Sequence, residues 1–301
     1  MSEAKEEIVV TEGEVLTPQN RLSPTSINSF FRCPRCYFFQ YIAKLKTPPN
    51  INLVKGSIVH KVLEDFFRGY KSDMQEHILD LFNKSWDKNE QAIKDLELPP
   101  EELTKEKQDA LNIIMEFYIS FKRKIDAFVQ VGKADNESHA FYLLKPKFRE
   151  LFVEDKELHC CGYIDRVHED FNGYLTIADY KTSNRYGVGF PEEYERQLSI
   201  YALLYKNQTK EWPHFAAVVF LRFGETDRLK ITPEVLKSAR DTIIDVYGRT
   251  RSVNIEDYPI GRDTKFCNFR DLHDGTADWE DKLRGQKLEE ALKNLGEKNG
   301  G

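Results

Sequence analysis

The hydrophobic pattern of this chain changes near Glu137, and that change limits its fold more than any other feature. Before it, apolar residues recur every three or four positions, as in Val59, Leu63 and Phe66, which is the spacing of one helical face. After it, apolar segments are short, aromatic or β-branched, and bounded by turn residues, as in strands. The order predicts a mixed α+β fold, in which helices flank a core sheet behind an N-terminal helical arm.

The periods and the Gly and Pro breaks place the individual elements. We expect a first helix that begins after Thr25 or Ser26 as N-cap and is interrupted by Pro34. Further helices are expected at 56–70, 75–95, 100–128, 192–207 and 233–249. Strands are expected at 140–146, 148–155, 157–170, 173–182 and 215–223, in a mainly antiparallel sheet.

Length and composition define the organisation. A chain of 301 residues, 40% of them hydrophobic, can bury a substantial core without staples. We expect a mobile segment at 1–20, one domain at 21–279 with a helical insertion at about 71–130, and a helical or disordered tail at 280–301, where the end LKNLGEKNGG resembles disorder.

Cysteine usage and hydropathy indicate the compartment. Five cysteines, with Cys160 and Cys161 adjacent, do not form a secreted disulfide framework. Neither a signal peptide nor a stretch of about 20 apolar residues is present. We expect a soluble protein without membrane contact, in the cytoplasm or, if phage-encoded, in the host cytoplasm.

The distribution of charge matters more than its total. A net charge of −6 argues against DNA as a partner, yet no Asp or Glu occurs from Leu16 to Leu63. The basic and aromatic residues there are Arg21, Arg32, Arg35, Lys44, Lys46, Lys55 and Lys61 with Phe30, Phe31, Tyr37, Phe38, Phe39 and Tyr41. This segment fits phosphate contacts with base stacking and equally fits an amphipathic helix with solvated cations.

The stretch GYIDRVHEDFNGYLTIADYKTSN contains the residues with the clearest chemistry. Asp165 lies between apolar neighbours of a predicted strand, where carboxylates are uncommon. Asp179 and Lys181 are two positions apart in the next strand and so share one face.

The turn between these strands decides whether Asp165 joins that face. A two-residue loop, Asn172-Gly173, would pair Asp165 with Tyr180 and separate the aspartates. A three-residue loop, 171–173, would pair Asp165 with Asp179 and needs Gly173 in the left-handed conformation. Both alternatives fit the sequence.

Facing carboxylates would favour a bound cation. Two such groups on a half-buried sheet repel each other, and oxygen ligands favour Mg²⁺ or Mn²⁺. Such an ion can activate water while Lys181 orients it or stabilises developing charge. A solvated Asp-Lys surface pair explains the residues equally well.

The ordered set of motifs resembles the PD-(D/E)XK nuclease superfamily, and within it the RecB-like exonucleases and the CRISPR-associated exonucleases of the fourth Cas family. Five pieces match in order over roughly residues 22 to 275: SPTSINSFFRCPRCYFFQYI, KGSIVHKVLEDFF, GYIDRV, IADYKT and YERQLSIYALLY. The resemblance implies a restriction-endonuclease-like core.

The resemblance also implies residue roles. It implies metal ligands at His60, Asp165, Asp179 and Tyr180, with Asp165, Asp179 and Lys181 as the catalytic set. For contacts to DNA we expect Gln197, Tyr201, Arg32 and Arg35. Gln197 and Tyr201 are four apart and share a helix face, where they could steady Lys181 or a phosphate. Taken alone, His60 would be interpreted as an ordinary helix histidine.

The cysteines depart from the family pattern. Many relatives hold an iron–sulfur cluster with one N-terminal and three C-terminal cysteines, whereas only Cys267 remains near this C-terminus, with Thr264 and His273 at the other expected positions. We therefore do not expect such a cluster. Cys33, Cys36, Cys267 and His273 form a possible zinc set, but we favour the alternative that the family site has decayed and these are ordinary buried or surface residues.

The expected function is a stand-alone, metal-dependent exonuclease that cleaves phosphodiester bonds at DNA ends or single strands in repair, recombination or phage DNA metabolism. No helicase phosphate-binding motif occurs, so a helicase, a recombination protein or a CRISPR-adaptation protein would be a separate partner. One alternative is a CRISPR-associated nuclease that trims DNA before spacer integration. The other is an inactive DNA-binding adaptor, which the intact set of His60, Asp165, Asp179 and Lys181 disfavours.

Overall fold

The computed structural model describes residues 16–184, 190–261, 267–273 and 275–298. By internal contacts the chain divides into two compact units, one made of Met1–Pro48 with Ile244–Gly301 and the other of Pro49–Ile243. The single domain predicted over 21–279 draws on both units, and its boundaries stay a prediction.

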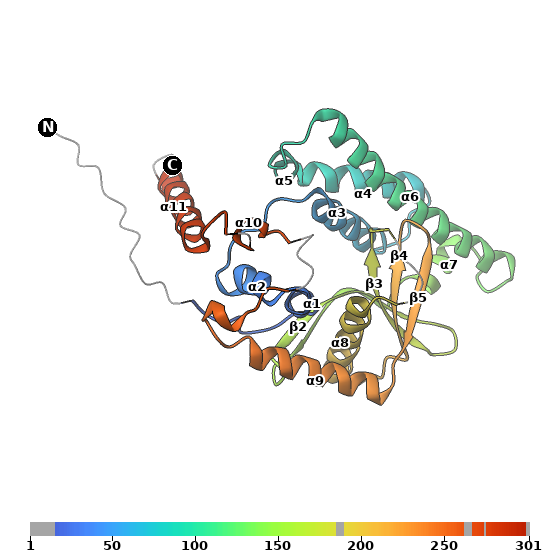
Figure 1. Ribbon diagram of the computed structural model, residues 1–301. Coiled ribbons are helices and arrows are strands. Elements are labelled where there is room, and N and C mark those ends of the chain that lie inside the picture. The colour runs from blue at the N-terminus through green and yellow to red at the C-terminus, as the bar shows by residue number, and fades with distance from the viewer. Residues whose placement is uncertain (1–15, 185–189, 262–266, 274, 299–301) are drawn as a thin grey trace. The chain divides into compact units, whose positions relative to one another are not determined.

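The larger unit contains a helical layer and a sheet. Its helices before the sheet are α3 (Ile51–Phe66), α4 (Met74–Lys88), α5 (Glu90–Lys94), α6 (Pro100–Gln130) and α7 (Glu137–Leu144). Its strands are β1 (Phe148–Asp155), β2 (Cys160–Glu169), β3 (Leu175–Lys181), β4 (Phe215–Phe220) and β5 (Glu225–Lys230), and α8 (Glu192–Thr209) connects β3 to β4. The helix α9 (Pro233–Arg249) follows β5 and continues into the other unit (Figure 1).

The five strands run in sequence order across the sheet. Neighbours are antiparallel except β3 and β4, which are parallel. The crossover through α8 provides the long connection that a parallel pair requires, and α8 packs across the sheet (Figure 1). The expectation of an α+β fold with a mainly antiparallel sheet is confirmed, because three of the four described strand pairs are antiparallel.

The opposite face of the sheet packs on the helical layer. Ile58, Val62 and Phe66 of α3 share one core with Phe117 and Phe121 of α6 and with Tyr180 of β3. Burying a side chain of this kind stabilises the fold by roughly 1.5–3 kcal/mol. This shared core fixes α3, and so His60, against the middle of the sheet.

The smaller unit joins the two ends of the chain. It contains α1 (Pro24–Arg32), α2 (Pro34–Tyr37), a π-helix (Phe38–Ile42), a short 3-10 turn (Ile255–Asp257), α10 (Arg270–His273) and α11 (Trp279–Lys298). Tyr37 stacks on Tyr258 with ring centroids 6.3 Å apart, and Phe39 contacts Phe269 at 5.5 Å. The aromatic residues near the N-terminus are thus mostly core residues.

Several predicted elements differ from the structure. The first helix is capped by Ser23, not by Thr25 or Ser26, because Pro24 is suited to its first position and the Ser23 hydroxyl accepts a hydrogen bond from Ser26 N. Most of the predicted strand 140–146 belongs instead to helix α7. Asn136 caps the N-terminus of this helix, because its side chain accepts a hydrogen bond from His139 N.

Other differences concern segment ends and the edge of the sheet. The predicted helix 75–95 divides at Asn89, and the tail is helical through Lys298. The edge strand β5 was missed because its sequence ETDRLK is polar, as solvated edges are. The expected mobility of 1–20 falls mostly on residues outside the described part.

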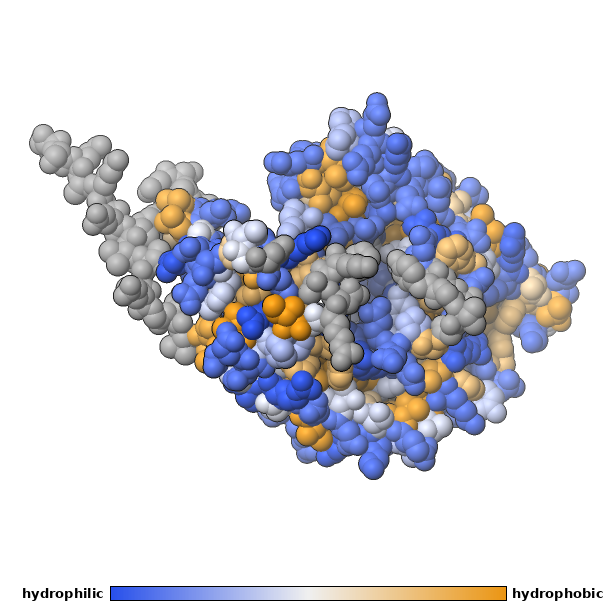
Figure 2. Space-filling view, viewed as in Figure 1, coloured by the Kyte–Doolittle hydropathy of each residue, from blue (hydrophilic) through white to orange (hydrophobic). Residues whose placement is uncertain are grey.

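The visible surface is largely hydrophilic. In Figure 2 hydrophobic residues on the described part of this face occur in small separate groups. Among the described residues no helix combines the length and the apolarity that crossing a membrane requires.

Candidate active site

The β2–β3 hairpin has the register that brings the two aspartates together. Arg166 pairs with Ala178 and Glu169 with Leu175, so the same register sets Asp165 opposite Asp179. Gly173 N donates to Asp170 O at 2.9 Å and Gly173 has φ +77°. The three-residue loop is therefore correct, and the two-residue alternative is excluded.

His60 of α3 reaches both strands of this hairpin. Its Nδ1 lies 3.2 Å from Asp165 Oδ1, and its Nε2 lies 3.1 Å from the carbonyl oxygen of Tyr180. The second Asp165 oxygen accepts from Tyr180 N at 2.6 Å. His60, Asp165 and Tyr180 thus meet at one point, and Asp179 stands opposite Asp165 in the hairpin register.

Lys181 and Gln197 complete the polar cluster from β3 and α8. Lys181 Nζ lies 2.7 Å from Asp179 Oδ2 and donates to Gln197 Oε1 at 3.0 Å. Gln197 Nε2 donates to Asp179 Oδ1 at 2.9 Å. From the sequence, Gln197 could contact Lys181 or a phosphate. The structure contains the contact with Lys181, and the same amide also contacts Asp179.

The electrostatics of the site are those of buried carboxylates compensated by nearby cations. Burial raises the pKa of Asp179, Lys181 opposes that effect and Asp165 adds to it. Burial lowers the pKa of Lys181, but Asp179, Tyr194 and Asp165 together raise it above its ordinary value, so the ammonium group stays charged. Burial also lowers the pKa of His60, but Asp165, then Asp179 and Glu150, raise it to about 9.

His60 is therefore an imidazolium at neutral pH, with both ring nitrogens donating. Its Nδ1–H donates to Asp165 and its Nε2–H to Tyr180 O, and the Glu150 carboxylate lies nearby. A positive charge among oxygen ligands is what a divalent cation would provide there, so the donor set fits Mg²⁺ or Mn²⁺.

Glu150 is a site residue that the sequence did not reveal. Its Oε1 lies 3.9 Å from His60 Nδ1, and together with His60 and Asp165 it forms a group whose ligand atoms all lie within 4.8 Å. Burial and then Asp165 raise its pKa. Its backbone has φ +45°, a conformation that costs a non-glycine residue energy. The available sequence signal was a carboxylate inside the predicted strand 148–155, but nothing there distinguished it from the others.

Tyr201 lies one turn beyond Gln197 and is 7% exposed. Burial, followed by the charge of Asp179, raises its pKa, so it stays a neutral phenol. Gln197 is 8% exposed, so both residues are largely buried beside the site, and their contact with DNA stays a prediction.

The two arginines expected to contact DNA lie in the smaller unit. Arg32 ends α1 and is exposed, whereas the Arg35 side chain is only 19% exposed. Arg35 Nε donates to Tyr258 O at 2.6 Å, so Arg35 helps to hold that unit together.

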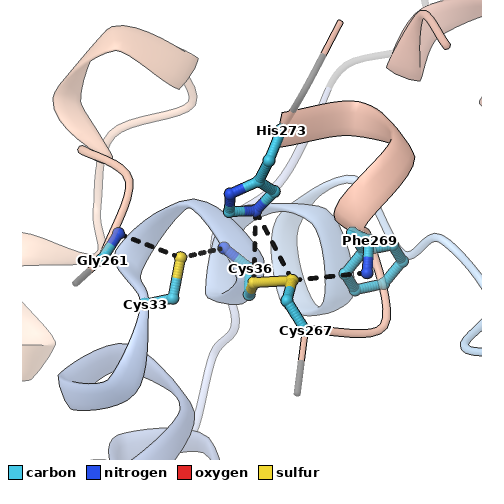
Figure 3. Close-up of a disulfide and its surroundings, with 6 residues drawn as sticks. All are labelled: Cys33, Cys36, Gly261, Cys267, Phe269 and His273. Carbon is cyan, nitrogen blue, oxygen red and sulfur yellow. Dashed lines mark hydrogen bonds between the residues drawn. A yellow bond between two sulfur atoms is a disulfide. The ribbon is translucent and has the colours of Figure 1, made fainter. Parts of the chain in front are cut away.

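The structure brings Cys33, Cys36, Cys267 and His273 together in the smaller unit (Figure 3). Cys36 and Cys267 form a disulfide, and His273 Nε2 lies 3.4 Å from Cys36 Sγ and 3.5 Å from Cys267 Sγ. Cys33 Sγ accepts from Cys36 N and Gly261 N. We expected ordinary buried or surface residues rather than a zinc site here, and that expectation stays a prediction. The disulfide between Cys36 and Cys267 was not predicted from the cysteine usage.

Comparison with known proteins identifies the family. The model of the PD-(D/E)XK nuclease superfamily matches residues 21–295. The chain belongs to this superfamily.

The matched span includes both carboxylate strands and Lys181, and the mixed sheet with flanking helices is consistent with the superfamily fold. Divalent metals such as Mg²⁺ or Mn²⁺ serve its nucleases generally. Among solved structures, a "Putative exonuclease" from Eubacterium rectale is similar, with a TM-score of 0.46 and 14% identity over 81% of this chain and 85% of that one. No curated protein matches the chain.

Proposed function

We propose that this member of a nuclease superfamily is a divalent-metal-dependent DNA exonuclease. The main support is the convergence of His60, Asp165, Asp179 and Tyr180 O beside Lys181, in the register that the hairpin loop sets. A solvated surface pair would not explain the 6% exposure of Asp179. The intact set also favours an enzyme over an inactive adaptor.

The metal ligands that we propose are His60, Asp165, Asp179 and the carbonyl oxygen of Tyr180, with Glu150 as a fifth candidate. A bound Mg²⁺ or Mn²⁺ would supply Lewis acidity and a more acidic water molecule. Occupation requires His60 to give up a proton, because its ring nitrogens donate to the same oxygens in the metal-free protein.

Lys181 is proposed to orient the attacking water or to stabilise charge that develops on the phosphate. Gln197 is a positioning residue, since it holds Lys181 and Asp179 at once. The Tyr194 ring lies 5.1 Å from Lys181 Nζ and restricts the ammonium from another side. Three contacts thus limit the positions that this side chain can adopt.

Degradation of end-labelled DNA tests the proposal. Purified protein is incubated with linear single-stranded DNA, linear duplex DNA and circular single-stranded DNA, with Mg²⁺, Mn²⁺ or chelator. An exonuclease shortens a linear substrate only with metal and spares the circle. Cleavage of the circular DNA would identify an endonuclease rather than an exonuclease. Absence of metal-dependent cleavage on every substrate would contradict the proposal as a whole.

A further inference from the structure

The sheet face opposite the side chains of Asp165 and Asp179 contains a cavity of about 120 Å³ beneath α6. Its floor is a row of paired residues across four strands. Arg166 pairs with Ala178, Ala178 with Ala217, and Ala217 with Arg228. Two adjacent alanines at the centre leave the space, and the two arginines stand about three strand spacings apart, about 14 Å.

The lining of this cavity is strongly basic. Arg166, His168 and Arg228 line it from the sheet, and Lys124 lines it from α6. Burial lowers the pKa of Lys124, and Arg166 and Arg228 lower it further. Burial, then Arg166, lower the pKa of His168 to about 4, with Lys124 and Arg228 contributing and Asp170 acting in the opposite direction. The charges of Arg166 and Arg228 therefore act on both Lys124 and His168, so the four side chains interact electrostatically.

Acidic residues do not balance these cations. In the described part of the chain, Lys124, Arg166 and Arg228 make no ion pair, and Arg166 Nε is buried without a hydrogen-bond partner. A buried, unsatisfied donor costs roughly 1–3 kcal/mol. The charge of Asp170 acts on His168, and the Glu116 side chain of α6 lies near Gly224, which also lines the cavity.

We propose that this cavity binds one phosphate group. Three cations line one small cavity, and one of them, Arg166, has an unsatisfied Nε donor; together they match a dianion with several acceptor oxygens. The volume is below the roughly 300 Å³ of pockets that hold drug-sized ligands, so it admits one phosphate and not a whole nucleotide. Free orthophosphate and the phosphate of a nucleotide or oligonucleotide offer the same chemistry.

The site is separate from the catalytic residues because it uses the alternate positions of the same strands. Arg166 and Ala178 point to the face opposite Asp165 and Asp179. Its existence therefore does not depend on the proposed nuclease activity, and its test can be done without metal and without cleavage.

Calorimetric titration of metal-free protein in EDTA tests the site. The probes are orthophosphate, a deoxynucleoside 5′-monophosphate, and a short oligonucleotide with and without a 5′-phosphate. We expect one site per chain and a loss of at least about tenfold in affinity in the variant K124Q/R228Q. Arg123→Gln, on the same helix but outside the lining, is the matched control and should bind as the unmodified protein does.

The probes separate the sources of the phosphate. Tight binding of orthophosphate identifies a free-anion site, whereas binding only of the phosphorylated oligonucleotide identifies a strand phosphate. Ala217→Leu should block either one by filling the cavity, with no change in charge. Phosphate should also raise the His168 pKa, which NMR titration can follow. Equal affinity of K124Q/R228Q and the control, or no binding of any phosphate probe, would overturn the proposal.

Discussion

Replacement of Glu150 by glycine should stabilise the metal-free protein and weaken its metal binding. At φ +45° this residue has the left-handed conformation, which costs an L-residue about 1–2 kcal/mol. Glycine removes that cost but loses about 0.5–1 kcal/mol through its own flexibility. The net gain is up to about 1.5 kcal/mol, or up to roughly 6 °C in melting temperature for a unit of this size.

Glu150→Gln separates charge from backbone strain. It keeps the strained backbone and removes only the carboxylate, whose pKa is raised by burial and by Asp165. Because the folded state holds this proton more tightly than the unfolded state, ionisation of Glu150 lowers stability as pH rises above the ordinary pKa of a glutamate. The glutamine variant should therefore exceed the unmodified protein in stability near pH 8 and lose that advantage near pH 4.

Thermal unfolding in EDTA and Mn²⁺ titration measure the two effects. Both variants should bind Mn²⁺ at least about tenfold more weakly, by analogy with the loss of a ligand or of its supporting contact. A glycine variant that is less stable than the unmodified protein in EDTA would refute the strain argument. Unchanged Mn²⁺ affinity in both variants would remove Glu150 from the metal site.

Three further predictions concern the hairpin, His60 and the cysteines. Gly173→Val should destabilise the hairpin by at least about 1–2 kcal/mol and lower activity with it. Gly173→Asn should destabilise it less in denaturant titrations, because asparagine tolerates φ +77°. Equal losses of stability in the two variants would contradict this prediction. Since the His60 pKa is about 9, Mn²⁺ affinity should rise by about tenfold per pH unit between pH 6.5 and 8.5, and this pH dependence should disappear in His60→Ala. A pH-independent Mn²⁺ affinity of the unmodified protein would contradict the assignment of His60 as a ligand. Elemental analysis of protein purified without chelator or reductant should find zinc and iron well below one per chain, because the disulfide occupies Cys36 and Cys267; one tightly held zinc or an iron–sulfur absorption band would show the reverse.

The geometry around Asp165 and Asp179 could be narrowed to two alternatives, because it follows from the number of residues between them and in the connecting loop. Strand side chains alternate, so the loop length alone decides which face Asp165 takes; the sequence left two loop lengths open, and the observed register is that of the three-residue loop. The α+β class followed from the change in hydrophobic period in the same way.

The remaining features depend on contacts that no local pattern specifies. The segment 140–146 has an apolar run that fits a strand or a buried helix, and the Asn136 cap with burial of Ala140 and Phe141 selects the helix. The position of Glu150 near His60 depends on a backbone conformation that its neighbours do not indicate. The aromatic residues at 30–39 were ambiguous because core packing and base stacking favour the same residue types, and Phe30, Tyr37, Phe38 and Phe39 are buried.

The most direct test of the central claim is the cleavage rate of end-labelled DNA by Asp179→Ala and Lys181→Ala under matched Mn²⁺, with DNA binding measured by anisotropy on the same preparations. Each variant should lose at least about 10²–10³-fold in rate while it retains DNA binding, because one lacks a proposed metal ligand and the other lacks the ammonium group beside it. If both variants cut DNA at nearly the rate of the unmodified protein, these residues are not the catalytic centre.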